Sequence, residues 1–332
     1  MKFNSQLLKE LVNLYGPSGN EKIIREYIKN EIKDYVDEMS TDDLGNLIAR
    51  KKGNGKRIMI AAHMDQIGLM VTDIDDKGFL RFTNIGGISP FITLSQQVIF
   101  ENGTVGVVSS EPIEDISKLK LANMFIDIGA KDKEEAEKLV TIGDICVYKS
   151  EYSDNENVVF TRCLDDRVGC FVAIEALKRI ESTKNDLYFV FTVQEEVGLR
   201  GAKTSAFRIE PDVGIAIDVT GSGDTPKAKT FAVGLHKGTA IKVKDNSILT
   251  HPKLRQIMVD IAKKNEIPYQ LEVLEYGGTD SGAIHLTKEG VPSGVISIPT
   301  RYVHSTIEMA SKKDILNSIN LLIKLLEHDI NL

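Results

Sequence analysis

Four apolar runs in the sequence lead into side chains that bind metals or move protons. In chain order these side chains are His63 and Asp65 after residues 57–62, Glu195 and Glu196 after 187–193, Asp218 within 213–219, and His304 beyond 294–299. A further pair, Asp165 and Asp166, precedes a predicted helix that begins at Val168. Because ligands of open α/β sheets bind beyond the carboxyl ends of the strands, we expect these groups at one rim.

Two imidazoles and three carboxylates from this group make a suitable ligand set for two divalent cations such as Zn²⁺, Co²⁺ or Mn²⁺. The set has no thiolate, which argues against a structural zinc site. Three carboxylates and two such cations leave about one positive charge, which would lower the pKa of a shared water toward about 7 and polarise a carbonyl oxygen. Of the two adjacent glutamates, one can bind metal while the other takes a proton. Asp65, two residues after His63, is placed to hold the other N–H of that imidazole.

Each of these features also has an ordinary structural explanation. A lone histidine at the end of a strand is usually a hydrogen-bonded surface or core residue. Asp165 and Asp166 before a helix are typical of an N-cap, and Glu195 and Glu196 are compatible with solvated loop charge. The coincidence of several such placements favours a metal site.

Hydrophobic periodicity predicts the elements that position these groups. Helical spacing is found at residues 7–15 behind an Asn4 or Ser5 cap, and at 23–32, 133–139, 168–180, 252–264 and 313–327. Strand-like runs are found at 46–50, 57–62, 187–193, 213–219, 239–244 and 294–299. The first two of these runs are joined by the hairpin-like KKGNGK. Continuous apolar strands between amphipathic helices predict an α/β fold with a mixed sheet covered by helices on both faces.

The middle of the chain has a different pattern. From about residue 68 to 160, apolar and polar residues alternate between turns rich in Gly, Asn and Asp, which is typical of a β-barrel or sandwich. A length of 332 residues suggests about two domains. We therefore expect a discontinuous catalytic α/β domain, residues 1–68 and 160–332, with a β-rich domain, residues 69–159, inserted into it.

Composition argues against several classes of protein. The 41 Lys and Arg against 48 Asp and Glu give a net charge of −7, with no basic excess for binding nucleic acid. No apolar run reaches the roughly 18 residues of a membrane span, and Lys9 and Glu10 interrupt the N-terminal helix, unlike a signal peptide. Cys146, Cys163 and Cys170 form no CxxC pair, which predicts small buried residues and no disulfide framework. We expect a cytoplasmic protein.

Seven segments, in order, resemble the tetrahedral aminopeptidase family, the di-metal group that contains glutamyl and deblocking aminopeptidases and members labelled as endoglucanases. They are GPSGNE (16–21), AAHMDQIG (61–68), RCLDDRVGC (162–170), TVQEEVGLRGA (192–202), AIDVT (216–220), YGGTDSG (276–282) and YVHS (302–305). The resemblance implies that Asp165 bridges two metals, with His63 and Asp218 completing one site and Glu196 and His304 the other. It also implies that Glu195 is the general base, that Asp65 orients His63, and that Asp166 lies behind the ligands.

The order of ligands is shared with related di-metal carboxypeptidases and deacylases. Those relatives carry their extra domain between the fourth and fifth ligands, whereas here the β-rich segment lies between His63 and Asp165. The aminopeptidase interpretation is therefore favoured, and the alternatives are another hydrolase on the same scaffold or a non-catalytic scaffold protein. The resemblance further implies a PDZ-like inserted domain that helps to build dimers, assembly of dimers into a tetrahedral dodecamer, and removal of N-terminal residues from small peptides.

Two further places are weighed as contacts for substrate. Gly278, Thr279 and Asp280 form a Gly-rich turn before a helical stretch, which is typical either of a capped turn or of a loop that contacts substrate. His251 precedes Pro252 at a predicted helix start, where capping or an interface fits better than metal binding. A contact from His251 to the active site of a neighbouring subunit is the alternative.

Overall fold

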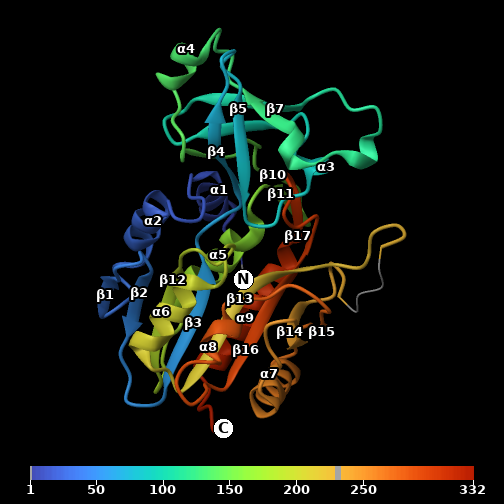
Figure 1. The fold of residues 1–332 in the computed structure, drawn as a ribbon. Coiled ribbons are helices and arrows are strands. Elements are labelled where there is room, and N and C mark those ends of the chain that lie inside the picture. Colours follow the sequence, from blue (N-terminus) through green and yellow to red (C-terminus); the bar gives the residue numbers. More distant parts are fainter. Residues whose placement is uncertain (1, 229–232) are drawn as a thin grey trace.

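The computed structural model describes residues 2–228 and 233–332 and shows a large mixed sheet with a closed barrel beyond one end (Figure 1). The chain enters the barrel after the strand that ends at His63 and returns to the large sheet at Ser153. No helix in the described part of the chain is long and apolar enough to cross a bilayer.

Within the described residues, the large sheet has eleven strands. In spatial order they are β1 (Glu38–Thr41), β2 (Leu47–Lys51), β12 (Asp186–Thr192), β3 (Arg57–His63), β13 (Val213–Gly221), β16 (Ser293–Arg301), β17 (Glu308–Ser311), β11 (Val158–Thr161) and β10 (Ser153–Asp154), with β14 (Thr239–Lys244) and β15 (Tyr269–Val273) branching from β16. The central strands β12, β3, β13 and β16 run parallel, so their carboxyl ends meet at one edge. The predicted α/β sheet is confirmed.

Helices cover both faces of this sheet, as predicted. On one face lie α1 (Ser5–Asn13), α2 (Lys22–Ile32), α5 (Leu164–Leu177), α7 (Pro252–Lys264) and α9 (Lys312–Leu326), and on the other α6 (Arg200–Ile209) and α8 (Ser281–Ile284). Alternate residues of β3 divide between the two layers: Ile58 and Ile60 pack in the first core, Met59 and Ala61 in the second. Every residue of α5 is buried, because other helices and the sheet surround it.

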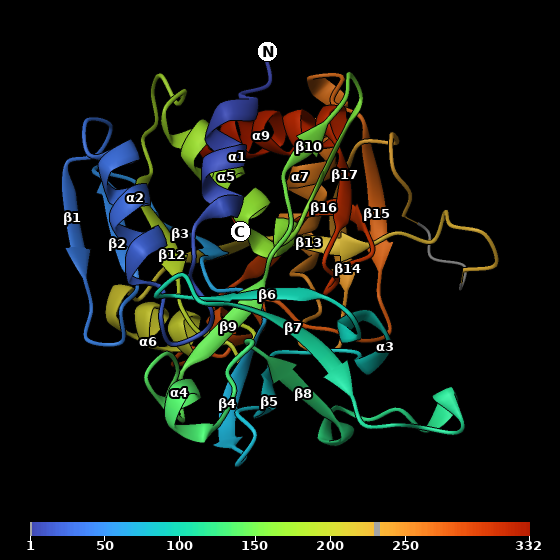
Figure 2. The ribbon, with the colours of Figure 1, turned by 90° about the horizontal axis from the view of Figure 1, so that it is seen from above.

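The barrel is closed by six antiparallel strands around their own core. In order around the barrel they are β4 (Gly68–Ile74), β5 (Leu80–Ile85), β8 (Met124–Asp127), β7 (Val105–Ser110), β6 (Gln97–Phe100) and β9 (Ile145–Tyr148). Short helices connect them: α3 (Pro90–Thr93), η1 (Ile116–Lys118), η2 (Leu121–Asn123) and α4 (Lys133–Glu137). Seen from above, the barrel strands lie across the end of the α/β layers (Figure 2). The predicted helix after Asp132 is present, since the Asp132 carboxylate accepts the Glu135 N–H.

One predicted connection is wrong. Strands β2 and β3 do not form a hairpin through KKGNGK, because β12 lies between them and pairs with both. The glycines of this segment serve a different purpose: a Cβ on Gly53 would lie 2.1 Å from the backbone oxygen of Asn185. The segment therefore runs against the entry to β12, and Gly55 donates to the Lys184 carbonyl at 2.6 Å.

Candidate active site

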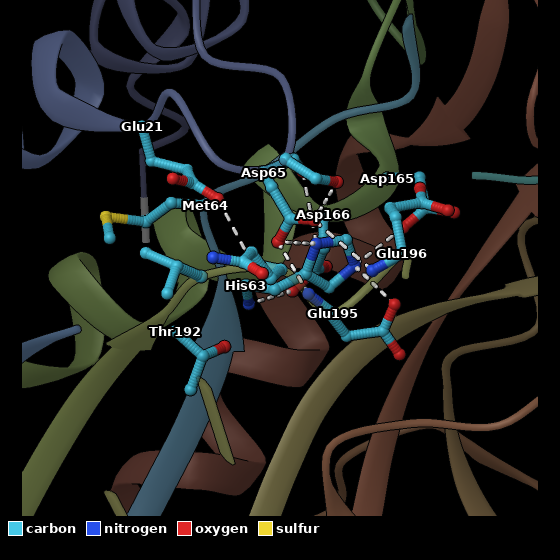
Figure 3. A network of polar contacts seen from close by, with 12 residues as sticks. Glu21, His63, Met64, Asp65, Asp165, Asp166, Thr192, Glu195 and Glu196 are labelled. Atoms are coloured by element: carbon cyan, nitrogen blue, oxygen red, sulfur yellow. Dashed lines mark hydrogen bonds and ion pairs between the residues drawn. The ribbon is translucent and has the colours of Figure 1, made fainter. Parts of the chain in front are cut away.

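The structure brings the side chains predicted for the rim together at the carboxyl edge of the four parallel strands. Figure 3 shows part of this cluster, with His63, Asp65, Asp165, Glu195 and Glu196 close to one another. His63 ends β3, Glu195 and Glu196 follow β12, Asp218 lies in β13, and His304 follows β16. They line a cavity of about 660 Å³, together with Asp165 from the start of α5. Neighbouring parallel strands place these groups side by side, as expected.

Asp165 lies at the centre of the cluster. Its Oδ1 is 3.1 Å from Nε2 of His63, and its Oδ2 is 3.2 Å from Nε2 of His304. Asp165 and Asp166 have non-helical backbone angles and are joined by a cis peptide bond, so the first turn of α5 departs from a regular helix. Asp166 lies behind the cluster, where its carboxylate accepts the backbone N–H groups of His63 and Gly169.

Asp65 connects His63 to the paired glutamates. Its carboxylate accepts the backbone N–H of Glu195 at 3.0 Å and of Glu196 at 3.2 Å, and the Ser18 hydroxyl at 2.6 Å. Nδ1 of His63 lies 3.1 Å from the Asp65 backbone oxygen and 3.4 Å from its carboxylate. The nearest acceptor of the imidazole is therefore the carbonyl of Asp65, with the carboxylate close behind.

Glu196 and His304 form the other side of the cluster. Oε1 of Glu196 lies 3.3 Å from Nε2 of His304 and makes no hydrogen bond, although it is buried. His304 has a left-handed backbone with φ of 61°. Such a conformation costs free energy in a non-glycine residue and persists where surrounding contacts enforce it.

Glu195 lies between the first histidine and Asp218. Its Oε2 is 3.9 Å from Nε2 of His63, and ligand atoms of His63, Glu195 and Asp218 all lie within 4.8 Å of one another. A second such group is formed by His63, Asp165 and Glu196. Geometry alone thus allows Glu195 to bind a metal or to act beside one.

Burial and crowding shift the ionisation of the cluster strongly. Burial raises the pKa of Glu195 and of Asp218 well above ordinary values, and neighbouring carboxylates add to this. Burial would lower the pKa of His304, but the carboxylates of Asp165 and Glu196, 3.2 and 3.3 Å from its Nε2, outweigh burial and raise that pKa to about 12. Carboxylates packed this closely are stabilised by positive charge among them.

The donor set fits divalent cations. Imidazole nitrogens and carboxylate oxygens are the ligands that zinc and its neighbours in the transition series accept. Oε1 of Glu196 is a buried acceptor without a hydrogen-bond donor, and Asp165 turns one oxygen toward each histidine. Unsatisfied buried acceptors are rare in proteins unless they serve a ligand or a reaction.

Of the residues predicted to contact substrate, the structure places only some at the cavity. Gly278 lines the cavity, whereas Thr279 and Asp280 are buried. Asp280 accepts the Thr192 hydroxyl at 2.5 Å, and burial raises its pKa to about 6. His251 is the N-cap residue of α7, without a side-chain cap, and is not among the residues that line the cavity.

The cysteines beside Asp165 are not metal ligands. Cys163 donates its thiol to the Val12 carbonyl and Cys170 donates to the His63 carbonyl. Both side chains are buried, as the sequence predicts.

Sequence reasoning missed several residues that hold the cluster in place. Glu308 is buried, and its carboxylate accepts the backbone N–H of Asp165 at 3.0 Å and of His304 at 2.9 Å. Glu21 accepts the backbone N–H of Gln194 at 3.1 Å. Ser18 and Glu21 belong to GPSGNE, one of the segments that resemble the family, so that motif could have pointed to them. Glu308 lies in no such segment, and its only clue is that it follows His304 by four residues.

Comparison with known proteins relates this chain to aminopeptidases. The family model described as M42 glutamyl aminopeptidase matches residues 45–321. A relative from Acetivibrio thermocellus with an aminopeptidase name is 55% identical over 96% of this chain and 97% of its own length. The lysyl aminopeptidase of Pyrococcus furiosus is 39% identical over 97% of this chain and 96% of its own.

Solved structures agree with this similarity. An aminopeptidase from Desulfurococcus kamchatkensis superposes with a TM-score of 0.94 at 41% identity, covering 97% of this chain and 94% of its own. The TET1 peptidase of Pyrococcus horikoshii, described as assembling into a tetrahedron or a large octahedral shell, gives 0.87 at 37% identity, covering 97% and 98%. A Thermotoga maritima protein named endoglucanase gives 0.84 at 34% identity, covering 98% and 97%.

Proposed function

The chain belongs to the M42 glutamyl aminopeptidase family and is an aminopeptidase, and from this premise we propose that it is a metal-dependent one, acting at the histidine and carboxylate cluster. It releases the N-terminal residue from peptides. The observation that carries the proposal is the position of Asp165, whose two oxygens each face a different histidine at 3.1 and 3.2 Å.

Two divalent cations, Zn²⁺, Co²⁺ or Mn²⁺, are the proposed cofactors. His63 and Asp218 would hold one, Glu196 and His304 the other, and Asp165 would be shared. Bound there, such cations would polarise the scissile carbonyl and acidify the attacking water. The orphan oxygen of Glu196 supports this assignment.

Glu195 is the proposed general base. It removes a proton from the attacking water as the water oxygen bonds to the carbonyl carbon, and it delivers that proton to the amine nitrogen as the C–N bond breaks. Burial raises the pKa of Glu195 above its ordinary value, which is the direction that favours a carboxylate able to hold and return a proton. Asp65 positions Glu195 through its backbone N–H and positions His63 from the other side.

The test uses purified, metal-loaded protein and aminoacyl p-nitroanilides, with N-acetylated substrates as controls. Cleavage of the free-amine substrates alone, abolished by a chelator and restored by Zn²⁺, Co²⁺ or Mn²⁺, is expected. Equal cleavage of the blocked substrates would contradict the aminopeptidase mechanism. Hydrolysis of cellulose that survives chelation would favour a carboxylate-only glycosidase, as the name of the Thermotoga maritima relative suggests.

Replacement of Glu195 separates its two conceivable roles. Glu195→Gln keeps the shape of the side chain but cannot accept a proton, so kcat should fall by about 100-fold or more while the metal content measured by mass spectrometry stays at the wild-type value. Loss of metal in this variant would make Glu195 a ligand, and full activity would remove its assigned role.

Assembly and domain roles complete the proposal. We assign residues 1–68 and 160–332 to the catalytic domain and 69–159 to an inserted domain that helps to form dimers, which assemble into a tetrahedral dodecamer. The solved tetrahedral relative supports this assignment. Light scattering should give a mass near twelve times 36.8 kDa; a monomer at micromolar concentration would contradict it.

A further inference from the structure

The cavity next to the cluster has an uncharged wall. Apart from the histidine and carboxylate groups, its side chains are hydroxyls and six larger apolar or aromatic groups: Leu199, Val219, Leu274, Tyr276, Tyr302 and Val303. Within residues 2–228 and 233–332, no Lys or Arg lines it. Its carboxylates are all members of the proposed catalytic cluster.

Arg200, next to Leu199 of the lining, is exposed and donates to the Gln194 side chain at 3.1 Å, while two other cations near this wall are paired with carboxylates. Arg301 lies between Thr300 and Tyr302 of the lining, but its guanidinium makes a two-point ion pair with Asp224 at 2.9 and 2.8 Å. Lys242 is buried and lies 2.6 Å from Glu272 and 3.1 Å from Asp245. Neither cation is left to receive an anionic side chain from a substrate.

An aminopeptidase must hold the first side chain of its substrate inside this cavity. The Cβ of the N-terminal residue is two bonds from the scissile carbonyl carbon, hence about 2.5 Å away. A charged side chain placed there would lose hydrating water without gaining a partner of opposite charge, which is unfavourable, whereas an apolar side chain is stabilised by leaving water.

We propose that the cavity selects peptides whose N-terminal residue is uncharged and apolar, of the leucine or methionine class, over those beginning with Glu or Lys. This inference rests on the proposed function and goes beyond it. It departs from the glutamyl description of the family and from the lysyl name of the Pyrococcus furiosus relative.

The first experiment needs only the wild-type protein in its assembled, metal-loaded form. We expect kcat/KM for leucyl and methionyl p-nitroanilide to exceed that for glutamyl and lysyl p-nitroanilide at least tenfold, the scale on which side-chain pockets discriminate. Free leucine should raise the melting temperature more than free glutamate or lysine at equal concentration. A glutamyl or lysyl optimum would overturn the inference, whereas cleavage of none of the four would contradict the proposed function itself.

Paired variants then place the selectivity in this wall. Leu274→Lys should raise glutamyl relative to leucyl kcat/KM at least tenfold, and Leu274→Glu should do the same for lysyl substrates. Leu271→Lys is the matched control, because Leu271 lies on the same segment but is 48% exposed and is not part of the lining. An unchanged ranking in both Leu274 variants, with wild-type melting temperatures, would show that the wall does not set the preference.

Discussion

Asp65 shows how much order a single buried carboxylate creates in this site. It accepts hydrogen bonds from Ser18 and from the backbone of Glu195 and Glu196, while the imidazole of His63 lies against the same residue. A proposed ligand histidine, the proposed base and a second proposed ligand therefore share one anchor. Any displacement of Asp65 reaches all three.

Glu21 provides a prediction about pH at the same scale. Burial, reinforced by Asp65, raises its pKa to about 7 in the folded protein from the 4.5 of a free side chain. Between these values the folded state retains a proton that the unfolded state has lost, so this group lowers stability as pH rises through the window. Glu21→Gln removes that contribution, which is at most about 3 kcal/mol.

Urea unfolding at pH 5, 6 and 7 measures the effect. As pH increases from 5 to 7, the free energy of unfolding of Glu21→Gln should rise relative to that of the wild type. The exposed Glu26 on the neighbouring helix supplies the control, since Glu26→Gln should leave the pH slope unchanged. Parallel slopes for Glu21→Gln and wild type would contradict the prediction.

At the scale of elements, two buried arginines join the end of α1 to the segments that carry His63 and Asp165. Arg167 donates to the carbonyls of Leu11 at 2.6 Å and Met64 at 2.7 Å, and more weakly to those of Leu14 and Gly16. Arg162 donates to the Asn13 carbonyl and to the Gln66 side chain. The last carbonyls of a helix have no partner within the helix and need donors from elsewhere. Here the donors are Arg162 and Arg167, which lie on either side of Asp165 in the sequence.

Removing the Arg167 guanidinium should therefore disrupt several elements together. Arg167→Met keeps the length of the stem but leaves buried carbonyls without donors, so the free energy of unfolding should fall by about 3 kcal/mol or more. Chemical denaturation measures this. Arg208→Met on the exposed face of α6 is the control and should change stability by less than about 0.5 kcal/mol. A similar small effect at Arg167 would show that water replaces the guanidinium.

Most elements could be predicted from periodicity because their apolar faces are regular. The strand at 239–244 and the helix at 252–264 match β14 and α7 to the residue. The order of strands in the sheet could not be derived, since nothing local in KKGNGK says that β12, more than a hundred residues later, will insert beside it. Short strands such as β10 at the edge of the sheet and β17 between β16 and β11 have too few residues to show a period.

The candidate site could likewise be predicted only in part. Residues at the ends of apolar strands could be placed because parallel strands share an edge. Glu308 could not, because its role is to accept backbone N–H groups, and such a role leaves no signature in residue type or spacing. The placement of Asp280 away from the cavity was likewise unpredictable, since it depends on the distant Thr192 hydroxyl.

At the scale of the whole molecule, the segment that follows β5 of the barrel touches the candidate active site of the α/β part. The segment after β5 passes so close that a Cβ on Gly86 would lie 2.8 Å from Oε2 of Glu196, and one on Gly87 would lie 3.0 Å from the His304 ring. Gly87 also lines the cavity. The barrel thus forms part of the wall of the site.

Gly86→Ala should lower kcat/KM about tenfold or more, because the added methyl group pushes on Glu196 and small misplacements of catalytic groups are costly. Gly103→Ala is a matched control: both glycines have positive φ, at 75° and 89°, but a Cβ on Gly103 meets nothing within 4 Å. Both variants should lose similar stability, and only Gly86→Ala should lose activity. Equal activity losses would mean that general destabilisation is responsible.

The cluster draws its parts from places far apart in the order of synthesis. Ser18 and His63 are made early, whereas His304 and the carboxylate of Glu308 that holds it come late. A nascent chain still on the ribosome therefore lacks the second histidine until residue 304 has been made, and lacks the carboxylate that holds it until residue 308. No N-terminal portion of the chain that stops short of Glu308 can therefore assemble the proposed site.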